Sequence, residues 1–325
     1  MFKTFTTWAE FVKLSHTIFA LPFALASMVV AARAPSAACP ECNRGWPGWR
    51  TFGLVLAAMV CARTCAMAFN RIVDRKFDAL NPRTAQRHLP AGKISLASAW
   101  LLWVVSAAGL IAASFFLNRI CFYLSPVAIA VICFYSLTKR FTDYTHVFLG
   151  IALALAPIGG WLAVKGEFGF ASLADLFNNR ISTHDYFAQA VIGLQPIVLA
   201  LVVVFWLIGF DIIYALQDYE FDRKHGLHSL VVAWGPANAL RAAFLAHMIM
   251  LGLLLAFGLL CKFRYAYVLG WIVIVVCVVL EHLIAKRRSL NWVQNAFFRL
   301  NAVVSMAFFV VTVAEVVFYG GFRLK

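Results

Sequence analysis

Charged side chains are scarce in this chain. Asp, Glu, Lys and Arg together make up 13% of its 325 residues, and acidic residues are the scarcer kind, 14 against 28 basic ones. Hydrophobic residues make up 63%, and the mean hydropathy is +0.84. A water-soluble globular domain of this length does not have such a composition. The sequence therefore excludes a soluble enzyme and predicts a polytopic membrane protein.

Long polar segments are also missing, so there is no place for a separate soluble domain. A membrane-crossing helix needs about 20 apolar residues, and nine runs of roughly this length are present. They lie at about 11–33, 51–70, 95–117, 119–138, 145–165, 191–213, 236–260, 265–285 and 296–319. We expect an all-α bundle of nine transmembrane helices forming a single domain over 1–325, although a short turn near Asn118 leaves eight or ten crossings open.

The polar loops are expected at about 34–50, 71–94, 166–190, 214–235 and 286–295. The first apolar run is longer than a signal-peptide core and has no small-residue cleavage site, so we expect it to stay attached. A cytoplasmic N-terminus places most basic residues in cytoplasmic loops, as the positive-inside rule requires. This bias, together with anionic lipid headgroups, accounts for the net charge of +14. Nucleic-acid binding is not indicated, and a bacterial inner membrane is the expected location.

Clusters of histidine and cysteine, which would indicate a zinc site, do not accompany the acidic residues. Six of the eight cysteines lie in or beside apolar runs, where cysteine behaves as a small hydrophobic residue. Cys39 and Cys42 lie in a loop expected to face away from the cytoplasm. For this pair a disulfide, half of a metal site and an incidental feature all remain open.

The few acidic residues are concentrated at the ends of two apolar runs. Six of the fourteen lie there: Asp74, Asp78, Asp211, Asp218, Glu220 and Asp222. Residues four apart share one face of a helix, so Asn70, Asp74 and Asp78 are predicted to form one stripe. A second stripe, spaced by three, four and four, consists of Asp211, Tyr214, Asp218 and Asp222. We expect the two stripes to face each other from the cytoplasmic ends of their helices.

Converging carboxylates repel each other unless a cation lies between them. Asp211 at membrane depth would cost about 2.5–3.5 kcal/mol on insertion scales. Carboxylate and amide oxygens are hard ligands that suit Mg²⁺, which binds through few carboxylates together with substrate phosphate. The pattern therefore predicts Mg²⁺ and a diphosphate. The competing explanation is that both stripes are solvated helix ends with ion pairs between residues four apart. The presence of two such stripes in one membrane protein makes this explanation less favourable.

Three blocks of the sequence resemble the UbiA superfamily of intramembrane aromatic prenyltransferases. They are residues 70–78 (NRIVDRKFD) with 83–92 (RTAQRHLPAG), residues 135–142 (YSLTKRFT) and residues 211–222 (DIIYALQDYEFD). The resemblance runs from about 11 to 319, with 34–50 and 166–190 as insertions. It implies nine transmembrane helices around a central cavity, with Mg²⁺ and an isoprenyl diphosphate at the cytoplasmic mouth.

The resemblance also implies roles for individual residues. Asn70, Asp74 and Asp78 would form the first Mg²⁺-diphosphate motif, and Asp218 and Asp222 the second, which Asp211 joins. Four cations would contact the diphosphate or the acceptor: Lys139, Arg140, Arg83 and Arg87. From its spacing, Tyr214 is a candidate to touch either substrate, with ordinary helix packing as the alternative.

The implied reaction is Mg²⁺-dependent transfer of a polyprenyl group from its diphosphate to a hydroxylated aromatic carboxylic acid of the 4-hydroxybenzoate type, in quinone biosynthesis. No obligatory protein partner is indicated. Lys13 and His16 could meet the acceptor carboxylate, with helix packing as the alternative for His16. Residues 15–24 (SHTIFALPFA) and 63–70 (RTCAMAFN) resemble a subgroup associated with menaquinone made through futalosine. Its acceptor would be 1,4-dihydroxy-6-naphthoate.

Two further alternatives remain. Haem farnesylation occurs within the same superfamily, but the acceptor-side residues disfavour it. Intramembrane acids such as Asp211, Glu281 and Glu315 also occur in ion-coupled transporters. A transporter, however, gives no reason for two aspartate stripes followed by an arginine-containing loop.

Overall fold

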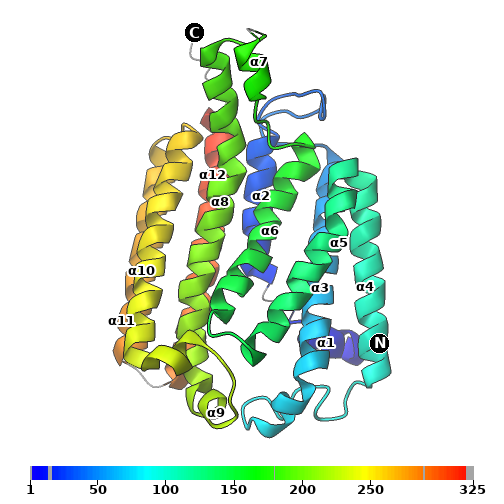
Figure 1. The fold of residues 1–325 in the computed structure, drawn as a ribbon, viewed down its shortest axis with the longest axis vertical. Helices are drawn as coiled ribbons and strands as arrows, with labels where there is room; N and C mark the ends of the chain where they lie inside the picture. Colours follow the sequence, from blue (N-terminus) through cyan, green and yellow to red (C-terminus); the bar gives the residue numbers. More distant parts are fainter. Residues whose placement is uncertain (1, 14–16, 179, 288–289, 320–325) are drawn as a thin grey trace.

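Most of the residues that the structure describes lie in helices (Figure 1). A computed structural model describes residues 2–13, 17–178, 180–287 and 290–319. The α-helices are α1 (Phe2–Phe11), α2 (Thr17–Ala31), α3 (Trp49–Leu80), α4 (Leu96–Leu117), α5 (Arg119–Phe134), α6 (Thr145–Lys165), α7 (Leu173–Phe177), α8 (Thr183–Ala215), α9 (Tyr219–Lys224), α10 (Leu230–Leu260), α11 (Tyr265–Arg287) and α12 (Leu290–Ala314). Two 3₁₀ segments, η2 (Tyr135–Arg140) and η3 (Leu216–Asp218), and a π-helical turn, η4 (Glu315–Tyr319), extend them.

The prediction of an all-α membrane bundle is confirmed. In the described part of the chain, eight helices are long and apolar enough to cross a membrane, and a ninth apolar helix, Phe19–Ala31 within α2, is shorter. The boundary near Asn118 is now clear. This residue has an extended backbone, and its side-chain oxygen accepts a hydrogen bond from the backbone N–H of Cys121, so it ends α4 and caps α5.

The bundle is built around α6 and α8. Helix α8 packs against α10 and α6, α2 packs against α6 and α12, and α3 packs against α4. In Figure 1, α3, α4 and α5 lie on one side of these central helices, and α10 and α11 lie on the other. Aromatic side chains fill the contact between α2, α8 and α12, where Phe23 lies against Trp206 and Phe308. Gly160 of α6 lets α2 approach, because a Cβ there would clash with the carbonyl oxygen of Ala24.

Several expected boundaries are wrong, including those of the loop expected at 214–235, which contains η3, α9 and the first residues of α10. The run at 11–33 is not one helix, because α1 ends at Phe11 and Lys13 has a φ of 51°, a left-handed conformation that interrupts a helix. Helix α3 continues to Leu80, whereas a loop was expected from 71, since charged residues remain good helix formers beyond the membrane. The expected loop 166–190 contains α7 and the start of α8, which Ser182 caps.

The two ends of the bundle differ in chemistry. The loop after α3 and the α9 region lie at one end, and α7 and the loop after α2 lie at the other (Figure 1). Cys39 and Cys42 form a disulfide in the latter loop and are both buried. This result decides between the alternatives that the sequence left open for the pair.

Candidate active site

The first acidic motif lies on the last turns of α3. Asn70 donates a hydrogen bond from Nδ2 to Oδ2 of Asp74, at 2.9 Å, so the amide and the carboxylate lie on one face of the helix. Asp78 follows one turn later and is buried. The predicted stripe is therefore present, because α3 remains helical through all three positions.

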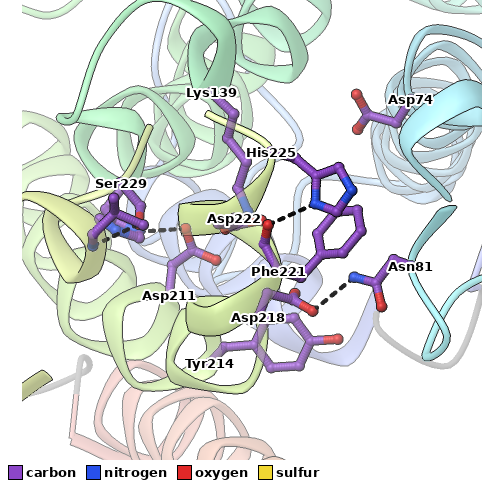
Figure 2. A network of polar contacts seen from close by, with 12 residues as sticks. Asp74, Asn81, Lys139, Asp211, Tyr214, Asp218, Phe221, Asp222, His225 and Ser229 are labelled. Carbon is purple, nitrogen blue, oxygen red and sulfur yellow. Dashed lines mark hydrogen bonds and ion pairs between the residues drawn. The ribbon is translucent and has the colours of Figure 1, made fainter. Parts of the chain in front are cut away.

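The second acidic motif was predicted to form one continuous helical stripe, and this prediction is wrong. Helix α8 ends at Ala215, and the 3₁₀ turn η3 separates Asp211 from Asp222 on α9. A 3₁₀ helix has about 3 residues per turn, so it changes the direction in which the following side chains point. Asp218 and Asp222 are nevertheless both buried at the same end of the bundle as Asp74 (Figure 2).

Arg83 connects the loop after α3 to the second motif. Its Nε donates to Oδ1 of Asp218 at 2.9 Å, and its Nη2 pairs with Oδ2 of the same carboxylate. This is the two-point geometry in which arginine binds a carboxylate most strongly. Asn81, which the sequence reasoning missed, also donates to Oδ1 of Asp218, at 3.1 Å (Figure 2).

Three further ion pairs are formed by the remaining acids and cations of the two motifs. Their N–O distances are 2.6 Å for Arg87–Asp78, 3.3 Å for Lys139–Asp222 and 3.6 Å for Arg140–Asp74. The last two join different elements, because Lys139 and Arg140 lie in η2. The pairs are thus not the contacts four residues apart that solvated helix ends would show. Instead they draw α3, η2 and α9 together.

These residues line a cavity of about 550 Å³. Twelve of the thirteen predicted site residues contribute to its wall: Lys13, Asn70, Asp74, Asp78, Arg83, Arg87, Lys139, Arg140, Asp211, Tyr214, Asp218 and Asp222. The thirteenth, His16, lies outside the described residues. Two segments about 140 residues apart in the sequence therefore meet at one cavity.

Beyond its polar mouth the cavity is apolar. It continues between α3, α4, α5 and α6, where its wall includes Met59, Leu110, Leu124 and Leu153. It reaches Leu117 at the end of α4, close to the opposite end of the bundle. A polar mouth joined to a long apolar interior suits a ligand with an anionic head and a hydrocarbon chain.

Two arginines of α3 contribute to the cavity although the sequence reasoning did not select them. Arg63 lies deeper than the acidic motif, and its Nε is buried with no hydrogen-bond partner in the described part of the chain. Arg71 is buried beside the mouth. Burial lowers the pKa of Lys13, and the nearby positive charges of Arg71 and Arg87 lower it further. A lone arginine within an apolar run was the available signal for Arg63, since such residues are costly unless they serve a ligand.

The mouth carries the donor set that a Mg²⁺-diphosphate complex requires. Among the described residues, no three acidic, histidine or cysteine side chains converge on one point, so the protein does not supply a closed metal cage. Mg²⁺ does not need one, because it keeps several waters and binds through one or two carboxylates and substrate phosphates. Oδ2 of Asp78 is buried without a hydrogen-bond partner in the described chain and is available for such a ligand. The residues present therefore fit the ion.

The fold is a membrane-embedded helical bundle, and its cavity has a polar, charged mouth and an apolar interior. Residues 20–303 match the UbiA prenyltransferase family, and the chain belongs to this family. It is therefore a membrane prenyltransferase, as the resemblance of its motifs predicted.

Known proteins similar to this chain include both enzymes and solved structures. A 4-hydroxybenzoate octaprenyltransferase of Pseudomonas aeruginosa (strain LESB58) is 28% identical over 275 residues, covering 83% of each chain. One of Francisella tularensis subsp. novicida (strain U112) is 26% identical, covering 84% of this chain and 87% of the relative.

Solved structures show the same fold. The apo structure of a UbiA homolog from Aeropyrum pernix K1 has a TM-score of 0.75 and 29% identity, covering 93% of this chain and 98% of that one. A UbiA homolog from Archaeoglobus fulgidus bound to GPP and Mg²⁺ has a TM-score of 0.63 and 20% identity, covering 94% and 99%.

Proposed function

We propose that this protein transfers a polyprenyl group from polyprenyl diphosphate to a hydroxylated aromatic carboxylic acid of the 4-hydroxybenzoate type, with Mg²⁺, in quinone biosynthesis. The observation that carries the proposal is the single cavity that joins two acidic motifs and four cations at its mouth to an apolar interior. The similarity to 4-hydroxybenzoate octaprenyltransferases and to a homolog bound to GPP and Mg²⁺ supports it. We place the mouth at the cytoplasmic face of a bacterial inner membrane, with the whole chain acting as one domain.

The two acidic motifs are assigned to the metal and the diphosphate. Asn70, Asp74, Asp78, Asp218 and Asp222 would hold Mg²⁺, which when bound neutralises charge on the departing diphosphate. Arg83, Arg87 and Lys139 already donate hydrogen bonds to carboxylates, and Arg140 forms an ion pair with Asp74. All four can donate equally to phosphate oxygens. Their fixed positive charge favours the state in which the allylic C–O bond breaks and negative charge collects on the leaving group.

The apolar interior is assigned to the prenyl chain and to the exclusion of water. Water would capture an allylic cation, so the acceptor ring must meet C1 of the chain in a dry region. Tyr214 lies at the boundary between the two parts of the cavity, with its hydroxyl 3.2 Å from Nη1 of Arg83 and its ring facing Phe298. It is therefore placed to contact the reacting end of either substrate.

The positive charges on the α3 side of the cavity are assigned to the acceptor carboxylate. Arg63 and Arg71 supply guanidinium groups, and Lys13 carries an ammonium group at the mouth. His16 remains a candidate from the sequence alone. The carboxylate of an aromatic acid would accept a hydrogen bond from Nε of Arg63, which is otherwise buried without a partner in the described chain. An aromatic ring without a carboxylate would leave this N–H without a hydrogen bond.

The second candidate acceptor is 1,4-dihydroxy-6-naphthoate, favoured by Lys13 and the sequence around it. Both acids offer a carboxylate and a hydroxylated ring, so the same residues would serve either. An ion-coupled transporter has less support, because Glu281 accepts a hydrogen bond from Asn301 and Glu315 accepts one from the backbone of Tyr267. These acids have local structural partners, and neither lines the cavity.

The test is a prenylation assay on membranes that contain the protein. Labelled polyprenyl diphosphate and Mg²⁺ are supplied with either 4-hydroxybenzoate or 1,4-dihydroxy-6-naphthoate, and the lipid product is identified. We expect Mg²⁺-dependent prenylation of one acid and its loss in Asp74→Ala and Asp218→Ala. Prenylation of haem instead would overturn the acceptor assignment. Turnover equal to that of the wild-type protein in Asp74→Ala and Asp218→Ala would overturn the site assignment.

A further inference from the structure

A histidine lies against one of the cavity acids, between two central helices. His146 is in the first turn of α6, and its Nδ1 lies 2.7 Å from Oδ2 of Asp211 on α8. The side chain of His146 is completely buried, whereas that of Asp211 is 20% exposed. Only Asp211 of the two lines the cavity. The histidine thus contacts the acid on the side away from the cavity and does not itself line the cavity.

The direction of this hydrogen bond follows from the surroundings of the two groups. An ionised carboxylate only accepts, so Nδ1 of His146 must donate. Its other ring nitrogen, Nε2, is buried with no partner in the described part of the chain. A doubly protonated ring would leave a charged N–H unsatisfied there, which is more costly than an unused lone pair. The hydrogen bond therefore favours the ring tautomer of His146 that carries its proton on Nδ1.

Asp211 differs in its partners from the other carboxylates of the site. Asp74, Asp78, Asp218 and Asp222 each pair with an arginine or a lysine. In the described chain, the side chain of Asp211 pairs with His146 and with no arginine or lysine. Asp211 also lines the cavity. It is thus the acid of this site that, among the described residues, is free of a cation and can accept a hydrogen bond from a hydroxyl group of the acceptor.

We infer that His146 is a positioning residue for Asp211 in the transfer reaction, an inference that rests on the proposed function. The bond from Nδ1 to Oδ2 fixes the carboxylate so that its second oxygen is left for the acceptor hydroxyl. That oxygen takes the hydroxyl proton, and the electron pair of the O–H bond stays on the phenolic oxygen and enriches the ring. The diphosphate leaves with the C–O electron pair, a ring carbon bonds to C1 of the resulting allylic cation, and that ring carbon loses its proton to the diphosphate or to water. Asp211 then returns its proton to the phenolic oxygen of the product.

The kinetic test compares His146→Ala with His146→Asn, whose amide can donate from near the position of Nδ1. We expect His146→Ala to lower kcat roughly 10- to 100-fold, part of the usual contribution of a general base, with the KM for prenyl diphosphate within about twofold. His146→Asn should recover most of the loss, and His146→Ala should have no further effect in an Asp211→Ala background. A matched control is His184→Ala, because His184 forms an exposed pair with Asp185 and should leave turnover unchanged.

An additive loss in the double variant, or no recovery in His146→Asn, would overturn the inference. A second measurement tests the contact between His146 and Asp211 without relying on turnover. If the wild-type enzyme is inactive on both acids, the proposed function fails, and this measurement still decides the role of His146. NMR of the purified protein labelled with ¹⁵N-histidine reports which ring nitrogen carries the proton. We expect an Nδ1-protonated ring whose signals vanish in His146→Asn and shift in Asp211→Ala. An Nε2-protonated ring, or one indifferent to Asp211→Ala, rejects the positioning role.

Discussion

Asp218 is the carboxylate with the most polar contacts at the cavity mouth. It accepts hydrogen bonds from Arg83 and Asn81, and it is buried. Burial alone would lower the pKa of Arg83, but the hydrogen bonds to Asp218 outweigh this effect and raise it, so the arginine stays charged. The negative charge of Asp218 is thus what keeps a cation in place at the mouth before substrate arrives.

Asp218→Asn tests the need for that charge with little change in shape. We expect kcat/KM to fall at least about 100-fold and the Mg²⁺ concentration for half-maximal activity to rise, because a ligand for the metal is lost. Prenylation rates measured across a Mg²⁺ titration check this. Asp175→Asn is the control, since Asp175 forms an exposed pair with Arg180. An unchanged Mg²⁺ requirement in Asp218→Asn would remove this residue from the metal site.

Arg63 tests the acceptor assignment. Arg63→Met keeps a long apolar side chain but removes the donors, so we expect the KM for the aromatic acid to rise roughly 10- to 100-fold, as for a lost charged hydrogen bond. The KM for prenyl diphosphate should change little. Steady-state kinetics with each substrate varied in turn separate the two effects, and Arg63→Lys should show an intermediate value. An equal rise in the KM for prenyl diphosphate would contradict the assignment of Arg63 to the acceptor carboxylate.

At the scale of elements, the close contact of α2 with α6 helps to shape the cavity. Gly160 sits where a Cβ would meet the backbone of Ala24, whereas the neighbouring Gly159 has nothing within 4 Å of its Cβ position. Adjacent glycines of one helix therefore have opposite surroundings and form a natural pair for comparison.

Gly160→Ala should destabilise the protein, and Gly159→Ala should not. Forcing α2 away from α6 costs about 1–3 kcal/mol, as in other overpacked cores, while alanine at 159 improves helix propensity. Thermal unfolding in detergent checks both, and we expect a lower Tm for Gly160→Ala alone. Equal Tm values for the two variants would mean that α2 and α6 do not pack as closely as described.

At the scale of the whole molecule, the orientation in the membrane decides which compartment supplies the substrates. Lys93, in the loop after α3, lies at the end that carries the cavity mouth, and Ser182 lies before α8 at the other end. Both residues are exposed. The positive-inside rule predicts that the mouth faces the cytoplasm.

Single-cysteine variants of a cysteine-free protein test this orientation. In intact cells, a membrane-impermeant maleimide should label Ser182→Cys directly and Lys93→Cys only after permeabilisation. Labelling of both before permeabilisation would mean leaky cells, so a cytoplasmic marker protein serves as the control. The reverse pattern would place the cavity mouth outside the cytoplasm.

The sequence could predict the secondary structure at the site only in part. Spacing alone gave the stripe of Asn70, Asp74 and Asp78, because three positions on one unbroken helix share a face. It failed for Asp211 and Asp222, because η3 interrupts the helix between them. That break depends on how α9 packs across the mouth, where Lys139 pairs with Asp222.

The sequence by itself determined the membrane bundle, the acidic motifs and their association with basic residues, because composition and helical period act locally along the chain. Only the tertiary structure decided which acid pairs with which cation. Arg83 and Asp218 are 135 residues apart, and His146 and Asp211 are 65 apart. Such contacts depend on which helix faces meet, and this is set by the packing of apolar surfaces across the whole bundle.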